Sequence, residues 1–166
     1  LPSRRGDKAA DLRSLGAEIV YKHAARLQEQ YPGIKIVVMG DMNDDPFDDS
    51  MVKYLHGQET IAEVNPDDYF NPYLSMIKNG FGTLCYRDVW SIFDQELVNY
   101  NLAAAPDGGY RILPSCQDKY YGNTFNAPFL IQQSGKYKNY PFRTFSGSEF
   151  IGGYSDHFPT FIVIGR

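Results

Sequence analysis

Residues 34–45 read IKIVVMGDMNDD, and this stretch decides the fold. Its first six residues form a β-branched run of the kind that is buried on both faces of a sheet. The run follows a helical pattern over residues 9–30, which stops at Tyr31-Pro32-Gly33 because proline disfavours helical geometry in the residue before it and glycine permits a turn. A helix followed by a buried strand predicts an α/β layer architecture.

The helix predicted for residues 9–30 is amphipathic. Its apolar residues recur at spacings of three, four and one, which is the stripe of a helix that packs on a sheet. The stripe consists of Leu12, Leu15, Ile19, Val20, Ala24 and Leu27. We expect the charged residues to lie on the outer, solvated face, and these are Arg13, Glu18, Lys22, Arg26 and Glu29.

The remaining elements are shorter. The sequence predicts a pair of strands at residues 83–86 and 89–93, on either side of Arg87-Asp88. It also predicts a closing strand at residues 160–164. Short helical segments are expected at residues 48–55 and 73–77, and residues 57–82 are otherwise irregular.

The composition indicates a single folded domain over residues 1–166. Hydrophobic residues make up 43% of the chain and aromatic residues 15%, which is enough for a core. The formal net charge of −4 excludes the basic surface of a non-specific nucleic-acid binder, so a polyanionic substrate must be held by a local cluster or a metal ion. No apolar run approaches the ~20 residues of a transmembrane segment.

The two cysteines, Cys85 and Cys116, lack the spacing of zinc ligands. They exclude a zinc ribbon and leave one optional disulfide.

The first candidate functional residues lie at the end of the predicted strand and in the acidic loop after it. Asp41 and Asn43 stand two residues apart just past a strand end, so their side chains can point the same way and share one small-molecule or metal site. The alternative is that Gly40-Asp41 is only a turn and that the later aspartates are solvated.

Two further segments carry a histidine and carboxylates. Asp156 and His157 adjoin the closing strand, and this pair is the minimal set for metal binding beside proton transfer. Asp94 lies in an otherwise apolar strand, where a buried carboxylate needs a partner such as an imidazole. A surface histidine capped by its neighbour is the alternative for His157.

Three motifs in this order, GDMND (residues 40–44), WSIFDQ (residues 90–95) and GYSDHFP (residues 153–159), resemble the endonuclease/exonuclease/phosphatase superfamily. The opening PSRRG, Gly82-Thr83 and PFRT (residues 141–144) resemble a bacterial branch of it, so the similarity runs nearly end to end. The resemblance implies a divalent-metal-dependent phosphoester hydrolase, whose substrate is a nucleic acid, a phospholipid headgroup or a sugar or inositol phosphate.

The resemblance also implies roles for individual residues. Asp41 would orient or deprotonate the attacking water, and Asn43 would contact a phosphate oxygen or help to place the metal. His157 would contact the phosphate, with Asp94 fixing its tautomer. Asp156, together with Asp41, would bind Mg²⁺ or Mn²⁺, since carboxylate oxygens suit hard ions. Arg143 is a candidate substrate-binding residue because it lies in a family-like motif.

The sequence departs from the family pattern at its start. The metal-binding glutamate of the family, an accompanying asparagine and a further histidine have no counterpart here. We therefore expect the C-terminal part of the domain, an α/β structure with a mixed sheet and flanking helices that forms about half of a four-layer α/β-β/α sandwich. Weak metal binding, low activity of this chain alone, and association with the N-terminal half or a second chain are also expected.

Two other functions were weighed. A catalytically inactive binding module on the same fold is the alternative to an enzyme. A serine hydrolase of the α/β type is excluded because the chain has no Gly-x-Ser-x-Gly elbow.

Overall fold

The computed structural model describes residues 1–6, 8–115 and 120–166. The helices are α1 (Ala9–Gln30), α2 (Tyr73–Lys78) and α3 (Tyr100–Ala103), with helical turns η1 (Ser50–Tyr54), η2 (Ile61–Glu63) and η3 (Pro128–Leu130). The strands are β1 (Val37–Asp41), β2 (Gly57–Gln58), β3 (Tyr69–Phe70), β4 (Leu84–Tyr86), β5 (Val89–Ser91), β6 (Asp94–Asn99), β7 (Arg111–Leu113), β8 (Gly122–Thr124), β9 (Phe145–Ser146), β10 (Glu149–Phe150) and β11 (Thr160–Gly165).

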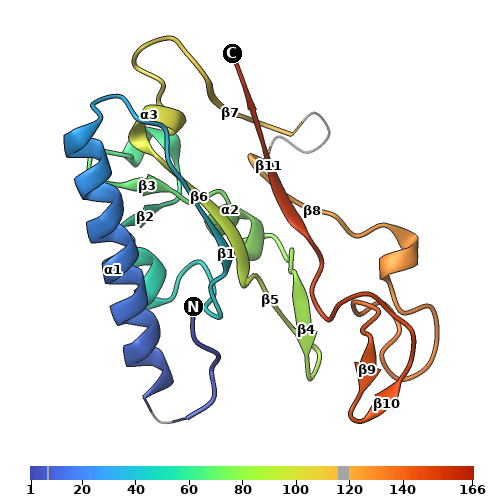
Figure 1. Cartoon of the computed structure of the whole chain (residues 1–166). Helices are drawn as coiled ribbons and strands as arrows, with labels where there is room; N and C mark the ends of the chain where they lie inside the picture. Colours follow the sequence, from blue (N-terminus) through green and yellow to red (C-terminus); the bar gives the residue numbers. More distant parts are fainter. Residues whose placement is uncertain (7, 116–119) are drawn as a thin grey trace.

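A four-stranded sheet in the order β1-β6-β3-β2 forms the centre of the fold. β6 pairs antiparallel with β1 and with β3, whereas β2 and β3 are parallel, so the sheet is mixed. Helix α1 covers one face of this sheet (Figure 1), where Ala17 and Ala24 pack with Tyr69 and Leu97. The prediction of an α/β fold with a mixed sheet is confirmed.

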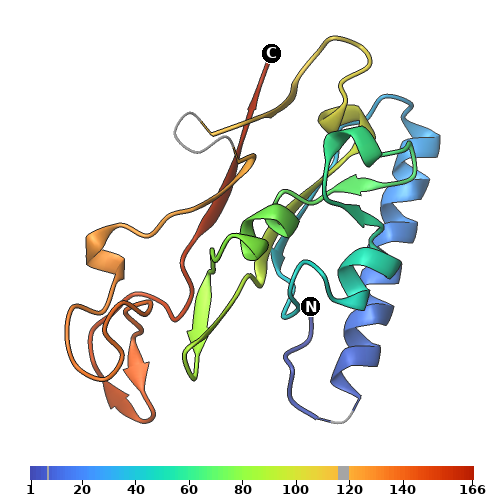
Figure 2. The same cartoon turned by 180° about the vertical axis from the view of Figure 1, so that it is seen from behind.

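A second sheet, in the order β7-β11-β8, lies on the side of the central sheet away from α1 (Figures 1 and 2). Val98 and Phe70 of the central sheet belong to one buried cluster with Ile112 of β7, and Ile162 of β11 packs against it. The molecule is therefore layered as helix, sheet and sheet, and β11 runs beside β6.

Two hairpins extend from one end of these layers (Figure 2). One pairs β4 with β5 and the other pairs β9 with β10. The first hairpin turns at Arg87 and Asp88, which both have positive φ, as the two central residues of a type I′ turn require. The strand pair predicted around these two residues is confirmed.

Helix α1 has the predicted bounds, but the prediction of its buried face is wrong in part. Leu12, Leu15 and Ile19 are each more than half exposed, whereas Arg13 is buried. The reason is electrostatic: Asp44, in the loop after β1, is also buried, and its carboxylate lies 2.7 Å from the Arg13 guanidinium. A buried carboxylate requires a partner, so α1 turns its arginine inward.

The strand predicted at residues 34–39 is displaced and is not buried on both faces. β1 begins at Val37 and ends at Asp41, and Met39 is 70% exposed. The cause is its position at the end of the sheet order, where it pairs with β6.

The aspartates that follow β1 are not simply solvated. Asp44 and Asp45 are buried, and Asp44 accepts a hydrogen bond of 2.6 Å from Ser50 Oγ. Asp45 accepts 2.9 Å and 3.2 Å bonds from the Ile92 amide and Ser91 Oγ. These bonds tie the acidic loop to the segment that leads into β6.

Two remaining expectations concern cysteines and membranes. Cys85 is buried, whereas Cys116 lies outside the described residues, so the optional disulfide is not tested. No helix in the described part of the chain has both the length and the apolar character of a membrane span.

Candidate active site

His157 and Asp94 form the centre of the site. His157 lies in the loop ahead of β11, and Asp94 is the first residue of β6. The imidazole Nδ1 is 2.7 Å from Asp94 Oδ2, and both side chains are more than three-quarters buried. An Nδ1–H group that donates to the carboxylate leaves Nε2 to interact with a substrate.

Asp41, in β1, lies at the same end of the central sheet as the His157–Asp94 pair. We call this end of the sheet the rim. In the antiparallel register, Asp41, the last residue of β1, stands directly opposite Asp94, the first residue of β6, so both lie at the same end of the strands. Asp41 is exposed, and one of its carboxylate oxygens accepts a 2.8 Å hydrogen bond from the Asn43 backbone N–H. Segments around positions 41, 94 and 157 thus converge at one end of the central sheet.

Asn43 is held in a turn with a φ of 54°. Its side-chain Nδ2 donates a 2.9 Å bond to the Leu1 carbonyl, and the Leu1 nitrogen donates a 2.7 Å bond to the Asp41 carbonyl. The turn therefore places Asp41 and Asn43 together, with Leu1 hydrogen-bonded to both.

Arg4 organises this turn, a role that the sequence did not predict. Its Nε donates a 2.8 Å bond to the Asn43 carbonyl, and its guanidinium lies 2.7 Å from Asp48 and 4.4 Å from the centre of the Phe93 ring. One arginine therefore connects the Asn43 turn to the residue that precedes Asp94. No spacing rule relates residue 4 to these partners, so only the structure reveals the contact.

Glu96 is a second residue that the sequence analysis missed. It is buried in β6, where it accepts hydrogen bonds from the Tyr73 hydroxyl and, at 2.8 Å, from Thr160 Oγ1. Because Thr160 begins β11, these bonds fix β11 against β6 close to His157. The structure buries Gln95 and Leu97 on either side of Glu96. In the sequence, the signal for a structural role was a glutamate placed inside a strand.

The electrostatic surroundings favour protonation of His157. Burial lowers the pKa of the imidazole, but the hydrogen bond and charge of Asp94 and the charges of Asp41 and Asp156 raise it, and the net shift is upward from 6.5. The stabilisation from protonated His157 is therefore fully present below its unfolded pKa and is lost as the pH rises through the folded pKa.

The two remaining predicted site residues are Asp156 and Arg143. Asp156 is exposed beside His157 and acts on it through its charge. Arg143 lines a separate cavity of about 210 Å³ with Lys136 and Glu149 among others. The structure does not join Arg143 to the His157–Asp94 pair by any hydrogen bond or ion pair within the described residues.

A complete metal site is not formed. Across residues 1–6, 8–115 and 120–166, no group of three or more histidine, cysteine, aspartate or glutamate side chains is placed to hold an ion. Asp41 and Asp156 can supply only part of a coordination shell, because hard divalent cations take about six oxygen ligands.

The fold and the site together define an α/β protein with a histidine–carboxylate pair at the rim of a mixed sheet. The sequence profile of the Endonuclease/Exonuclease/phosphatase family matches residues 1–166, and the chain belongs to this family. This membership places it among phosphoester hydrolases of the nuclease and phosphatase type. No curated protein and no solved structure gives a significant match to the chain.

The raised pKa of His157 can be measured directly. We expect an NMR pH titration to give a midpoint above 6.5 for His157, and Asp94→Asn to lower that midpoint, because the substitution removes the acceptor charge. Asp107→Asn, which removes an exposed carboxylate that pairs with Lys35, is the control and leaves the midpoint unchanged. A midpoint that Asp94→Asn does not alter would contradict the assignment.

Proposed function

We propose that this protein is a divalent-metal-dependent phosphoester hydrolase that uses an aspartate-activated water and a histidine–aspartate pair at the phosphate. The observation that carries the proposal is the 2.7 Å contact between His157 and Asp94, with Asp41 opposite Asp94 in the sheet. Three motifs that are far apart in sequence thus meet at one rim. Family membership supports the same class of reaction.

Each residue has a role that its geometry supports. Asp41 is exposed and takes the proton of the attacking water or orients it. His157, whose pKa is raised, stabilises the negative charge that develops on the phosphate oxygens. Asp94 does not touch the substrate, but accepts the Nδ1 proton of His157 and holds the ring in position.

Two further residues are proposed to contact the substrate. Asn43 lies beside Asp41, and its carboxamide, whose Nδ2 also donates to the Leu1 carbonyl, is proposed to contact a phosphate oxygen. Arg143 is proposed as a contact for a more distant part of the substrate, because it lies in a cavity of its own. The guanidinium suits an anionic group there.

We further propose Mg²⁺ or Mn²⁺ as the cofactor, with Asp41 and Asp156 as ligands. When bound, such an ion neutralises charge on the phosphate oxygens. The described residues do not complete its coordination shell, so additional ligands have to come from other groups. Metal binding by this chain alone is accordingly weak.

The exposed apolar residues on α1 and β1 support association with another polypeptide. Leu12, Leu15 and Ile19 are 51%, 52% and 60% exposed on α1, and Met39 is 70% exposed on β1. We propose that the N-terminal part of the domain or a second chain covers some of these exposed apolar residues. Light scattering that finds a monomer at high concentration would contradict association of the chain with itself.

The catalytic proposal predicts hydrolysis of a phosphodiester or phosphomonoester in a broad panel with Mg²⁺ or Mn²⁺, and its loss with EDTA. Asp41→Asn is expected to lower kcat/KM by about 100-fold or more, because a positioned general base contributes about that much. Asp94→Asn is expected to lower it by about tenfold to 100-fold through the orientation of His157.

Asp49→Asn is the matched control, because Asp49 is an exposed carboxylate paired with Lys53. The kcat/KM of this variant is expected to stay within about twofold of wild type, because surface substitutions away from a site usually have small effects. Absence of turnover across the panel, or an Asp41→Asn rate equal to wild type, would rule out this mechanism. Tight ligand binding by calorimetry without turnover would favour the non-catalytic binding module instead.

A further inference from the structure

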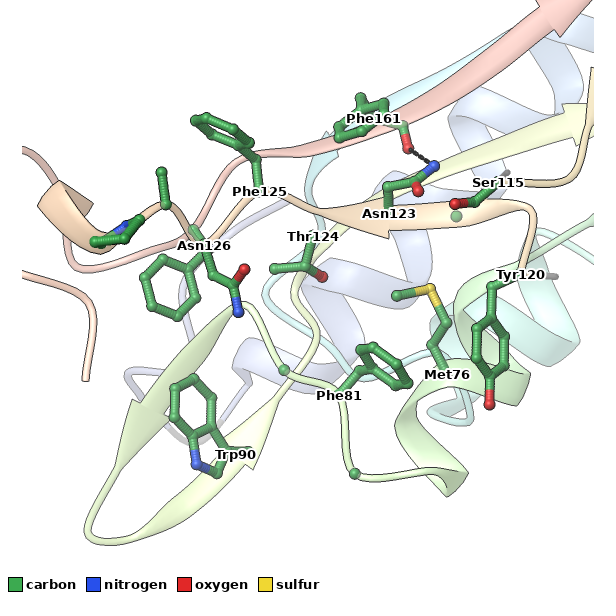
Figure 3. A pocket seen from close by; sticks show the side chains of 16 residues that line it. Met76, Phe81, Trp90, Ser115, Tyr120, Asn123, Thr124, Phe125, Asn126 and Phe161 are labelled. Carbon is green, nitrogen blue, oxygen red and sulfur yellow. Dashed lines mark hydrogen bonds between the residues drawn. The ribbon is translucent and has the colours of Figure 1, made fainter. Parts of the chain in front are cut away.

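A cavity of about 640 Å³ lies between the β4–β5 hairpin, helix α2 and strand β8. This volume falls in the range of about 300–1,000 Å³ that is usual for small-molecule sites. Figure 3 shows Trp90 and Asn126 at one end and Met76 and Tyr120 at the other, with Phe81 and Thr124 between them. The proposed function does not use these residues.

The cavity is uncharged. None of its described lining residues is an aspartate, glutamate, lysine, arginine or histidine. A phosphate or a metal ion would therefore find no charged partner in it, in contrast to the rim formed by Asp41, Asp94 and His157. A neutral group fits this lining better.

The aromatic residues provide faces for a flat ring. Trp90 stacks on Phe158 with ring centres 6.0 Å apart and an angle of 17° between the planes. Phe81, Phe125 and Phe161 also line the cavity. Aromatic faces around one space favour a planar, conjugated ring, because such a ring stacks on aromatic side chains.

The polar residues provide hydrogen bonds for the edge of such a ring. Asn126 is exposed, and its carboxamide offers both donors and an acceptor. Asn123 Nδ2 donates a 3.2 Å bond to the Phe161 carbonyl. Amide groups that present a donor beside an acceptor match the edges of nucleobases.

Thr124 supplies an independent indication of a ligand. Its Oγ1 atom is buried and has no hydrogen-bond partner among the described residues. An unsatisfied buried hydroxyl is unfavourable, because it has lost its hydrogen bonds to water and gained none. A ligand edge that bonds to this hydroxyl would remove the cost.

The cavity adjoins the proposed catalytic rim through the chain itself. Phe158, which lines the cavity, directly follows His157, and its amide donates a 2.7 Å bond to the Thr83 carbonyl. We propose that this cavity binds a neutral nucleobase, and that the phosphoester substrate is therefore nucleotidic. The second half of this proposal rests on the proposed function, whereas binding of the base does not.

Trp90 is the only tryptophan of the chain, so its fluorescence reports on the cavity. The full chain is titrated with neutral nucleosides, adenosine and cytidine, and with methyl glucoside as a sugar of similar polarity. We expect saturable quenching by at least one nucleoside and none by the sugar. Saturation by methyl glucoside alone, or no saturable change with either class, would overturn the proposal.

Two variants locate the binding. Asn126→Ala, at an exposed position, is expected to weaken nucleoside binding about fivefold to tenfold through a lost hydrogen bond. Gln30→Ala removes an exposed amide at the end of α1 and leaves the affinity unchanged. Equal affinities in the two variants would overturn the assignment.

Thr124→Val tests the orphaned hydroxyl while keeping the shape of the side chain. It is expected to weaken nucleoside binding about fivefold and to leave urea unfolding unchanged or slightly shifted toward higher stability. Unchanged affinity in this variant would contradict the role of Thr124.

The failure of this proposal can be told apart from failure of the catalytic one. Asp41→Asn is expected to retain full nucleoside binding, because Asp41 does not line the cavity. Nucleoside binding without hydrolysis would support the cavity and refute the catalytic proposal. Hydrolysis without nucleoside binding would support the catalytic proposal and refute nucleobase binding in the cavity.

Discussion

The antiparallel pairing of β1 with β6 is the constraint on which the site depends. Its register sets Asp41 opposite Asp94 at the edge of the sheet. A slip of one residue would move side chains to the opposite face, and the two carboxylates would no longer adjoin. Asp45 ties the loop after β1 to the Ile92 amide, two residues before Asp94, so the same acidic loop that carries Asp41 also helps to fix its partner strand.

The residues at the rim could be predicted from the sequence because each stands out locally. Asp41 and His157 adjoin strand ends, and Asp94 is a carboxylate in an otherwise apolar strand, where it needs a partner. The structure brings the three segments together. The bounds of α1 were equally accessible, since Pro32 and Gly33 end the helix. These features depend on local chemistry, which a single sequence displays directly.

Other features could not be predicted, because they depend on contacts between distant residues. The apolar stripe of α1 indicated the buried face only in part: Ala24 is buried, but the pairing of Arg13 with Asp44 outweighs the exposure of Leu12. Strands β7 and β8 are three residues long and show no period of their own, and pairing with β11 defines them. The link from Glu96 to Thr160 likewise joins positions 64 residues apart.

The tautomer of His157 tests the account most directly, since the proposed role of His157 at the phosphate requires Asp94 to accept its Nδ1 proton. Long-range ¹H–¹⁵N correlation spectra above the pKa of the imidazole distinguish the two neutral tautomers. We predict that neutral His157 carries its proton on Nδ1, so that protonation at Nε2 gives the cation that stabilises charge on the phosphate oxygens. A dominant Nε2–H tautomer would show that Asp94 does not orient the ring, and would contradict the central claim.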